Sequence, residues 1–179
     1  MLQVTKRSAL LILGLGLAAC ADDASSAGDA QTPPTKGSDV EAWIADGMYK
    51  AWKAETAVHA ARSPSPHGFN RIFVNDLVAA NAAGTAVWPK GSATVKELYD
   101  SETATTPIGY AVSLKLADDT AAGANWYWYE RIGSDVVADG NGDKGAPLSI
   151  CVGCHTGAGV DVAHTPTPGA RDQIYSPLK

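Results

Sequence analysis

The run Cys151-Val152-Gly153-Cys154-His155 holds the residues of this 179-residue chain best suited to chemistry. Two thiols separated by two residues can add to the two vinyl groups of one haem, and the adjacent imidazole can then bind the iron. Gly153 allows the backbone the tight approach that such attachment needs. The spacing therefore predicts one covalently bound haem c, attached at Cys151 and Cys154, with His155 as the proximal iron ligand.

Two other uses of these residues must be weighed. Cys151, Cys154, His155 and His164 are suitable zinc ligands, but their spacing is irregular for a common zinc module. The two cysteines could instead form a disulfide of the redox type. Haem is favoured because the chain also carries an export signal, and c-type haem is attached outside the cytoplasm.

The sixth position on the iron decides the chemistry. An electron carrier closes it with methionine or a second histidine, whereas a haem that binds or oxidises a small molecule leaves it open. Met48 lies on an apolar helical stripe, where core packing is the common role. His59 lies near a helix end and His67 in a proline-rich turn, and His164 is too close to the proximal histidine in sequence. No ligand stands out, which favours an open site.

The amino terminus is typical of an exported protein. Two basic residues precede a short apolar run that is too short to remain as a membrane helix. The sequence Leu17-Ala18-Ala19-Cys20 resembles the lipobox of bacterial lipoproteins, so residues 1–19 are predicted to be removed and Cys20 to carry lipid. Ordinary cleavage after Ala19 or Ala21 would instead leave a soluble periplasmic protein. We expect a location on the periplasmic or cell-surface side of a bacterial membrane, with the outer membrane favoured.

Charge and composition limit the partners and the domain count. Loss of Lys6 and Arg7 from 14 basic residues leaves 12 against 19 acidic ones, so the formal charge falls from -5 to -7. An acidic chain of this kind is not expected to bind nucleic acid. Residues 20–39 have too little apolar surface to fold and are predicted to be a flexible tether. Residues 40–179 are sufficient for one haem-binding domain.

The predicted fold is α+β, mainly an antiparallel sheet with an amino-terminal helix packed on it and the haem near the carboxyl-terminal loop. Apolar residues at helical spacing predict a helix over 40–61, with Ser38 or Asp39 as its cap. A short helix is expected over 77–83, and the chain after Gly133 is expected to be mostly loop. Alternation and β-branched or aromatic residues predict four strands. These cover residues 70–76, 93–99, 110–116 and 125–131.

Two further segments were assigned from their residue types. Trp126 and Trp128 make the last predicted strand rich in large apolar side chains, which either a haem or ordinary sheet-helix packing could cover. The segment 139–145 resembles the start of a calcium loop, but Lys144 replaces the turn glycine and Ile150 the bidentate glutamate. It is interpreted as a turn.

Several short patterns in chain order resemble the cytochrome P-460 family and its relative cytochrome c-prime-beta, over about residues 40–165. The patterns are His67-Gly68, Arg71, Val74-Asn75, Gly91, Val95-Lys96-Glu97 and Trp126-Tyr127-Trp128, followed by the haem motif. The resemblance implies a mostly antiparallel sheet and a five-coordinate haem with an open distal pocket. The family includes dimers, which leaves a homodimer open.

In the hydroxylamine-oxidising branch of that family, a lysine from this strand pattern is joined through its amine to the porphyrin edge. The matching position is Lys96, whose alternative role is that of a solvated strand lysine. The resemblance also implies an acidic distal base shortly before the haem motif, where this chain has Pro147, Leu148, Ser149 and Ile150. Glu97 and Glu130 are the substitutes considered, because hydroxylamine oxidation needs a proton acceptor.

The sequence therefore predicts an exported haem protein with an open iron site, one that binds or oxidises hydroxylamine or nitric oxide and passes electrons to a redox partner protein. Whether it is an enzyme, a hydroxylamine-oxidising oxidoreductase, stays open at this stage. A six-coordinate electron carrier and a nitric oxide-binding protein without turnover are the alternatives.

Overall fold

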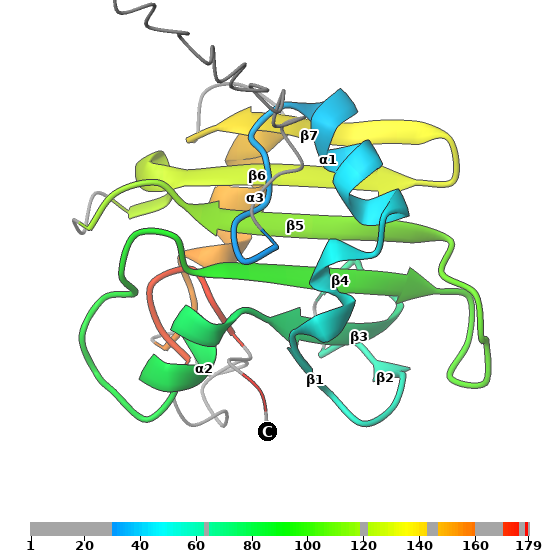
Figure 1. Ribbon diagram of the computed structural model, residues 1–179, viewed down its shortest axis with the longest axis horizontal. Helices are drawn as coiled ribbons and strands as arrows, with labels where there is room; N and C mark the ends of the chain where they lie inside the picture. Colours follow the sequence, from blue (N-terminus) through cyan, green and yellow to red (C-terminus); the bar gives the residue numbers. More distant parts are fainter. Residues whose placement is uncertain are drawn as a thin grey trace, which may run out of the picture.

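The computed structural model describes residues 30–62, 65–118, 122–142, 147–159, 170–175 and 178, and the predicted signal peptide and Cys20 lie outside them. Its centre is one antiparallel sheet in the order β1-β3-β4-β5-β6-β7, with β2 also paired to β3 (Figure 1). The predicted α+β class with a mainly antiparallel sheet is confirmed. The strands are β1 (Lys53–Ala54), β2 (His59–Ala60), β3 (Phe69–Val74), β4 (Ala93–Tyr99), β5 (Gly109–Lys115), β6 (Trp126–Ile132) and β7 (Asp135–Asn141).

The four predicted strands are confirmed as β3, β4, β5 and β6, and the short helix as α2 (Asp76–Asn81). Alternation along each strand sends successive side chains to opposite faces of the sheet. On β5, Val112 and Leu114 join a cluster with residues of α1 (Gly37–Ala45), while Ser113 and Ala111 face the other side. The sheet is covered on both faces, by α1 on one and by α3 (Leu148–His155) on the other (Figure 1).

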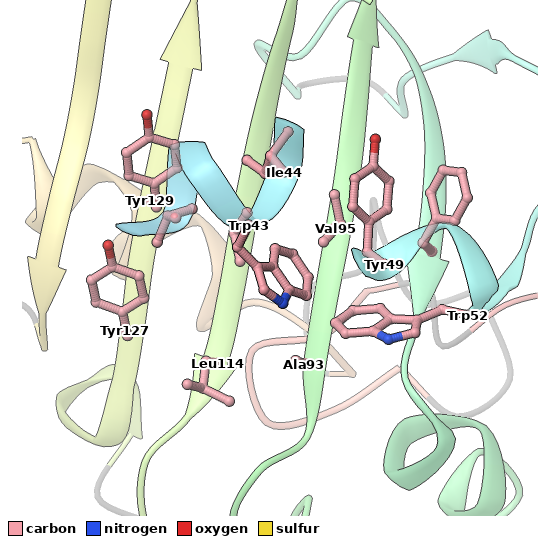
Figure 2. Packing of buried hydrophobic residues seen from close by; sticks show 12 residues of the cluster. Trp43, Ile44, Tyr49, Trp52, Ala93, Val95, Leu114, Tyr127 and Tyr129 are labelled. Atoms are coloured by element: carbon pink, nitrogen blue, oxygen red, sulfur yellow. The ribbon is translucent and has the colours of Figure 1, made fainter. Parts of the chain in front are cut away.

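The α1 face of the sheet is an aromatic core. Trp43 packs with Tyr49 and Trp52 at ring-centroid distances of 5.8 and 5.5 Å. Figure 2 shows these rings lying over the side chains of β4, β5 and β6. Burial of several aromatic side chains, each contributing roughly 150–250 Å², accounts for the position of α1.

The predicted helix over residues 40–61 is wrong in length. The helix α1 ends at Ala45, because Gly47 adopts a left-handed backbone with φ of 68°, and a 3-10 turn, η1 (Met48–Ala51), follows it. The predicted caps are also wrong, since neither Ser38 nor Asp39 caps the helix by its side chain. Instead the backbone N–H of Gly37 donates to Asp139 of β7 at 3.0 Å.

Contacts of the folded domain begin earlier than the predicted boundary at residue 40. The indole N–H of Trp52 donates to the backbone carbonyl of Ala30 at 2.8 Å. The side-chain amide of Asn75 donates to the backbone carbonyl of Gln31 at 2.9 Å. Residues 30 and 31, predicted as tether, therefore lie against the sheet.

The expectation of mostly loop after Gly133 is wrong for residues 135–141 and 148–155, which form β7 and α3. A two-residue turn at Gly133-Ser134 joins β6 to β7, and Gly133 has the positive φ of 58° that such tight hairpins favour. The strand β7 includes Asp139, the first residue of the segment interpreted as a turn, and that carboxylate accepts from Tyr127 and Gly37. The helix α3 then contains the whole Cys151–His155 run.

The helix α3 packs closely on the aromatic side chains of the sheet and on a glycine beside them. Its buried residues Leu148 and Val152 are four apart and share one helical face. They pack in a cluster with Trp126, Trp128 and Ala138. Gly123, in the 3-10 turn η2 (Ala122–Asn125), lies under Val152 so closely that an added Cβ would overlap the valine side chain.

Gly123→Ala is therefore expected to lower the free energy of unfolding by roughly 1–3 kcal/mol through overpacking. Measurement by chemical denaturation, alone and combined with Val152→Ala, separates overpacking from a propensity effect. The double variant should lose less stability than the two single losses combined, because alanine at 152 removes the overlapping atoms. Strictly additive losses would contradict this description of the contact.

Candidate functional site

One face of α3 carries the chemistry predicted from the sequence. Positions three and four apart in a helix share a face, so Cys151, Cys154 and His155 lie together, and the adjoining positions Leu148 and Val152 pack against the sheet. All three of the first set border one cavity. The structure thus brings together the three residues predicted to hold haem.

The cavity lies between this helical face and the sheet. Its empty space is about 600 Å³ with the open solvent at its mouth included. Strand register explains its shape, because small residues form its floor. Thr94 pairs with Ser113, and Ala111 stands between Lys96 and Glu130 in one cross-strand row. Lys96 and Glu130 therefore lie on either side of the small residue Ala111 in the sheet surface that borders the cavity.

A second, more polar cavity of about 490 Å³ adjoins the first. Both cavities are bordered by His67, Lys96, Cys154 and His155, which therefore stand at the boundary between them. The second is otherwise lined by His59, Ala61, Arg62, Ser65, Asn70, Ile72 and Tyr175. Lys96 and His155, the predicted proximal ligand, thus both lie at the boundary between the two cavities.

The imidazole of His155 is held on three sides. Its Nδ1 lies 2.6 Å from the carbonyl oxygen of Gln173, and because a carbonyl only accepts, Nδ1 carries the proton. Trp128 meets the ring edge-on at a centroid distance of 4.8 Å, and Tyr175 lies at 5.6 Å. In the neutral ring the lone pair is then on Nε2, the arrangement usual for a metal-binding histidine.

Lys96 is not the solvated strand lysine that was its alternative. It is partly buried and borders both cavities. Burial lowers the pKa of Lys96, while the charges of Glu130, Cys154 and Glu55 oppose that shift. A lowered pKa favours the neutral amine, which is the nucleophilic form.

His67, which the sequence places in a proline-rich turn, is a buried residue of the site. Its side chain is only 11% exposed, and Nδ1 lies 3.3 Å from Oε1 of Glu130. Burial lowers the pKa of His67, the charge of Lys96 lowers it further, and Glu130 opposes both. Only the glycine and prolines around it were visible in the sequence, and they do not reveal burial.

The two carboxylates considered as a base are now separated. Glu130 borders the cavity. Glu97 lies on the α1 face. There its carboxylate accepts hydrogen bonds from Tyr49 and Tyr99 at 2.6 Å each and pairs with Lys50. Glu97 is thus excluded from the cavity by strand alternation alone.

The candidates for a sixth iron ligand lie in different parts of the fold. Met48 packs against the aromatic core on the α1 face, away from the cavities. His59 is paired with Glu55 at 2.8 Å at the edge of the second cavity. His164 lies outside the described residues, and His67 borders the same cavity as the helical face of α3.

The described residues bear on the alternatives for the two cysteines in two ways. The thiols of Cys151 and Cys154 are not joined to each other, and burial raises the pKa of Cys151. Reactive cysteines of redox motifs have lowered values instead. Within the described residues, no group of three or more His, Cys, Asp or Glu side chains is arranged to hold a metal ion.

No helix of that same part of the chain is long and apolar enough to cross a membrane.

A comparison with known sequence families matches residues 47–165 to the family described as Cytochrome P460. The chain belongs to the cytochrome P460 family. The resemblance inferred from the short patterns is thereby confirmed, and membership makes the chain a haem protein. A search of curated protein sequences gives no match.

The cavity fits the haem that this family carries. A flat, mostly apolar group needs apolar walls with a few convergent polar groups, and Trp128, Ala111 and the α3 face supply such walls. The buried indole nitrogen of Trp128 has no hydrogen-bond partner among the described residues, so it is free to donate to a polar group of a bound ligand. Cys151, Cys154 and His155 would hold the group.

The placement of Lys96 and Glu130 around His67 predicts how the pKa of His67 responds to their substitution. The test uses the Cys151→Ala/Cys154→Ala background, which cannot form thioethers. Lys96→Met removes a positive charge that disfavours the imidazolium, so the pKa of His67 should rise. Glu130→Gln removes the negative charge that favours it, so the same pKa should fall. NMR titration of the His67 ring, assigned with His67→Gln, measures both. Shifts in the same direction would contradict the arrangement.

Proposed function

We propose that this chain attaches one haem c through Cys151 and Cys154, with His155 as proximal ligand, and binds or oxidises hydroxylamine or nitric oxide at the open side of the iron. The observation that carries the proposal is that these three residues and Lys96 border a single cavity. Each thioether forms by addition of S–H across a vinyl group, so it consumes no oxidant. When bound, the haem supplies the ligand-binding iron and the electron transfer.

Lys96 is proposed as a second covalent attachment, at the porphyrin edge. Such a bond joins the amine nitrogen to a ring carbon and replaces one N–H and one C–H, so it releases a proton from each and an electron pair. An oxidant of the peroxide class must accept that pair. Support comes from the stiff strand that holds the lysine and from the burial that lowers its pKa.

His67 and Glu130 are proposed to accept protons from a bound substrate. Oxidation of hydroxylamine releases protons together with electrons, so an acceptor at the cavity is required. His67 Nδ1 lies 3.3 Å from Glu130 Oε1 and makes no hydrogen bond within the described residues, so either group could take the proton directly. This pair replaces the acidic residue that the segment before the haem motif lacks.

His67 also supports a second candidate function. Because it borders the same cavity as His155, it could close the sixth position and make the protein a six-coordinate electron carrier. Methionine ligation by Met48 is disfavoured by its position on the other face.

The location proposed is the periplasmic or cell-surface side of a bacterial membrane, with Cys20 lipidated and a redox partner protein taking the electrons. This rests on the export signal and lipobox in residues 1–20.

Replacing His67 by alanine decides between the two candidates. An open site predicts five-coordinate spectra of the ferric and ferrous protein that do not change coordination in His67→Ala. A wild type that is six-coordinate and becomes five-coordinate in the variant would instead establish the electron carrier. Cys151→Ala/Cys154→Ala combined with Lys96→Met, which removes every proposed covalent attachment, should release the haem into acidified acetone in both cases.

The role of Glu130 separates an enzyme from a binding protein. Glu130→Gln should reduce hydroxylamine-dependent reduction of an artificial acceptor by roughly 10²–10⁴-fold, the range for a general base. Nitric oxide affinity should change little, since binding moves no proton. Glu97→Gln, on the opposite face, is the matched control. A wild type that binds nitric oxide but reduces no acceptor would leave only the binding function.

A further inference from the structure

A short segment of the chain after the haem motif, residues 170–175, returns to α3 and is named here the strap. One of its ends is fixed to the sheet by a buried ion pair, in which Lys115 Nζ lies 2.7 Å from Asp172 Oδ2. The side chains are 1% and 9% exposed. Trp88 adds two hydrogen bonds, from its backbone N–H to Asp172 at 3.1 Å and from its indole N–H to the Arg171 carbonyl at 3.0 Å.

The other end of the strap meets the proximal histidine. The carbonyl of Gln173 accepts from His155 Nδ1 at 2.6 Å, and the hydroxyl of Tyr175 donates to the Cys154 carbonyl at 2.5 Å. The residue that pairs with Lys115 is therefore the immediate neighbour of the one that fixes the imidazole. Three consecutive links connect the end of β5 to the predicted iron ligand.

The backbone between these links is strained. Asp172 and Gln173 have φ of 39° and 72°, a left-handed conformation that is uncommon for residues other than glycine. Reciprocal backbone hydrogen bonds between Arg171 and Ile174, at 3.0 and 2.9 Å, close the turn. Strained residues persist where their surroundings determine them, and such strain gathers at functional sites. The buried ion pair is one of the interactions that hold this turn.

We propose that Lys115 and Asp172 are positioning residues that set how strongly His155 donates to the haem iron. The inference rests on the proposed function, in which His155 is the axial ligand. An acceptor on Nδ1–H raises the basicity of a metal-binding imidazole, which stabilises the ferric state and lowers the reduction potential. The ion pair acts by holding the Gln173 carbonyl at hydrogen-bond distance.

The test uses the haem-loaded protein. Lys115→Met and Asp172→Asn should each shift the midpoint potential upward and shift the iron–histidine stretching band of the ferrous protein to lower frequency. Lys115→Arg, which keeps the cation, should return both readouts toward the wild type. The double variant Lys115→Met/Asp172→Asn leaves no buried unpaired charge, so it is the variant best able to fold. It should show the same shifts.

Glu97→Gln is the matched control, because it disrupts a buried polar group on the other face of the sheet. It should lower thermal stability without moving the potential or the band. Unchanged potential and band in the double variant would overturn the inference. A wild type with covalent haem but no iron–histidine band would overturn the proposed function itself, and is distinguished because it is seen before any substitution.

Discussion

The packing of α3 against the sheet is the contact on which the rest of the site depends. Leu148 and Val152 fix the rotation of the helix, and the turn of the helix then aims Cys151, Cys154 and His155 at the cavity. The glycine at 123 permits the close approach. Were this helix rotated by one residue, its thiols and imidazole would no longer face Lys96.

Strand alternation divides the protein into two functional halves. Lys96 and Glu97 are neighbours in sequence, yet one borders the cavity and the other lies in the tyrosine-rich core on the far face. Burial of that core against α1 stabilises the sheet without touching the site. The opposite face is consequently left to carry charged groups, and each of Lys96, Glu130 and Lys115 has an ionisable neighbour there.

Local patterns predicted most of the sheet and the grouping of the α3 residues. The alternation of β5 and the β-branched residues of β3 and β4 were sufficient for this, and the Cys151–His155 spacing pointed to the cavity. The helix predicted over 40–61 ends early because Gly47 stops it, although the apolar periodicity continues to Trp52. The burial of His67 and Lys115 could not be predicted, since each depends on partners distant in sequence, Glu130 and Asp172.

The central claim is that one haem is held from both sides of the cavity, by α3 and by β4. Proteolysis of the purified protein, followed by mass spectrometry of the haem-absorbing fragments, tests it most directly. The account predicts one species in which a single haem joins the peptide of Cys151 and Cys154 to the peptide of Lys96. Haem found on the cysteine peptide alone, with the Lys96 peptide recovered unmodified, would contradict it.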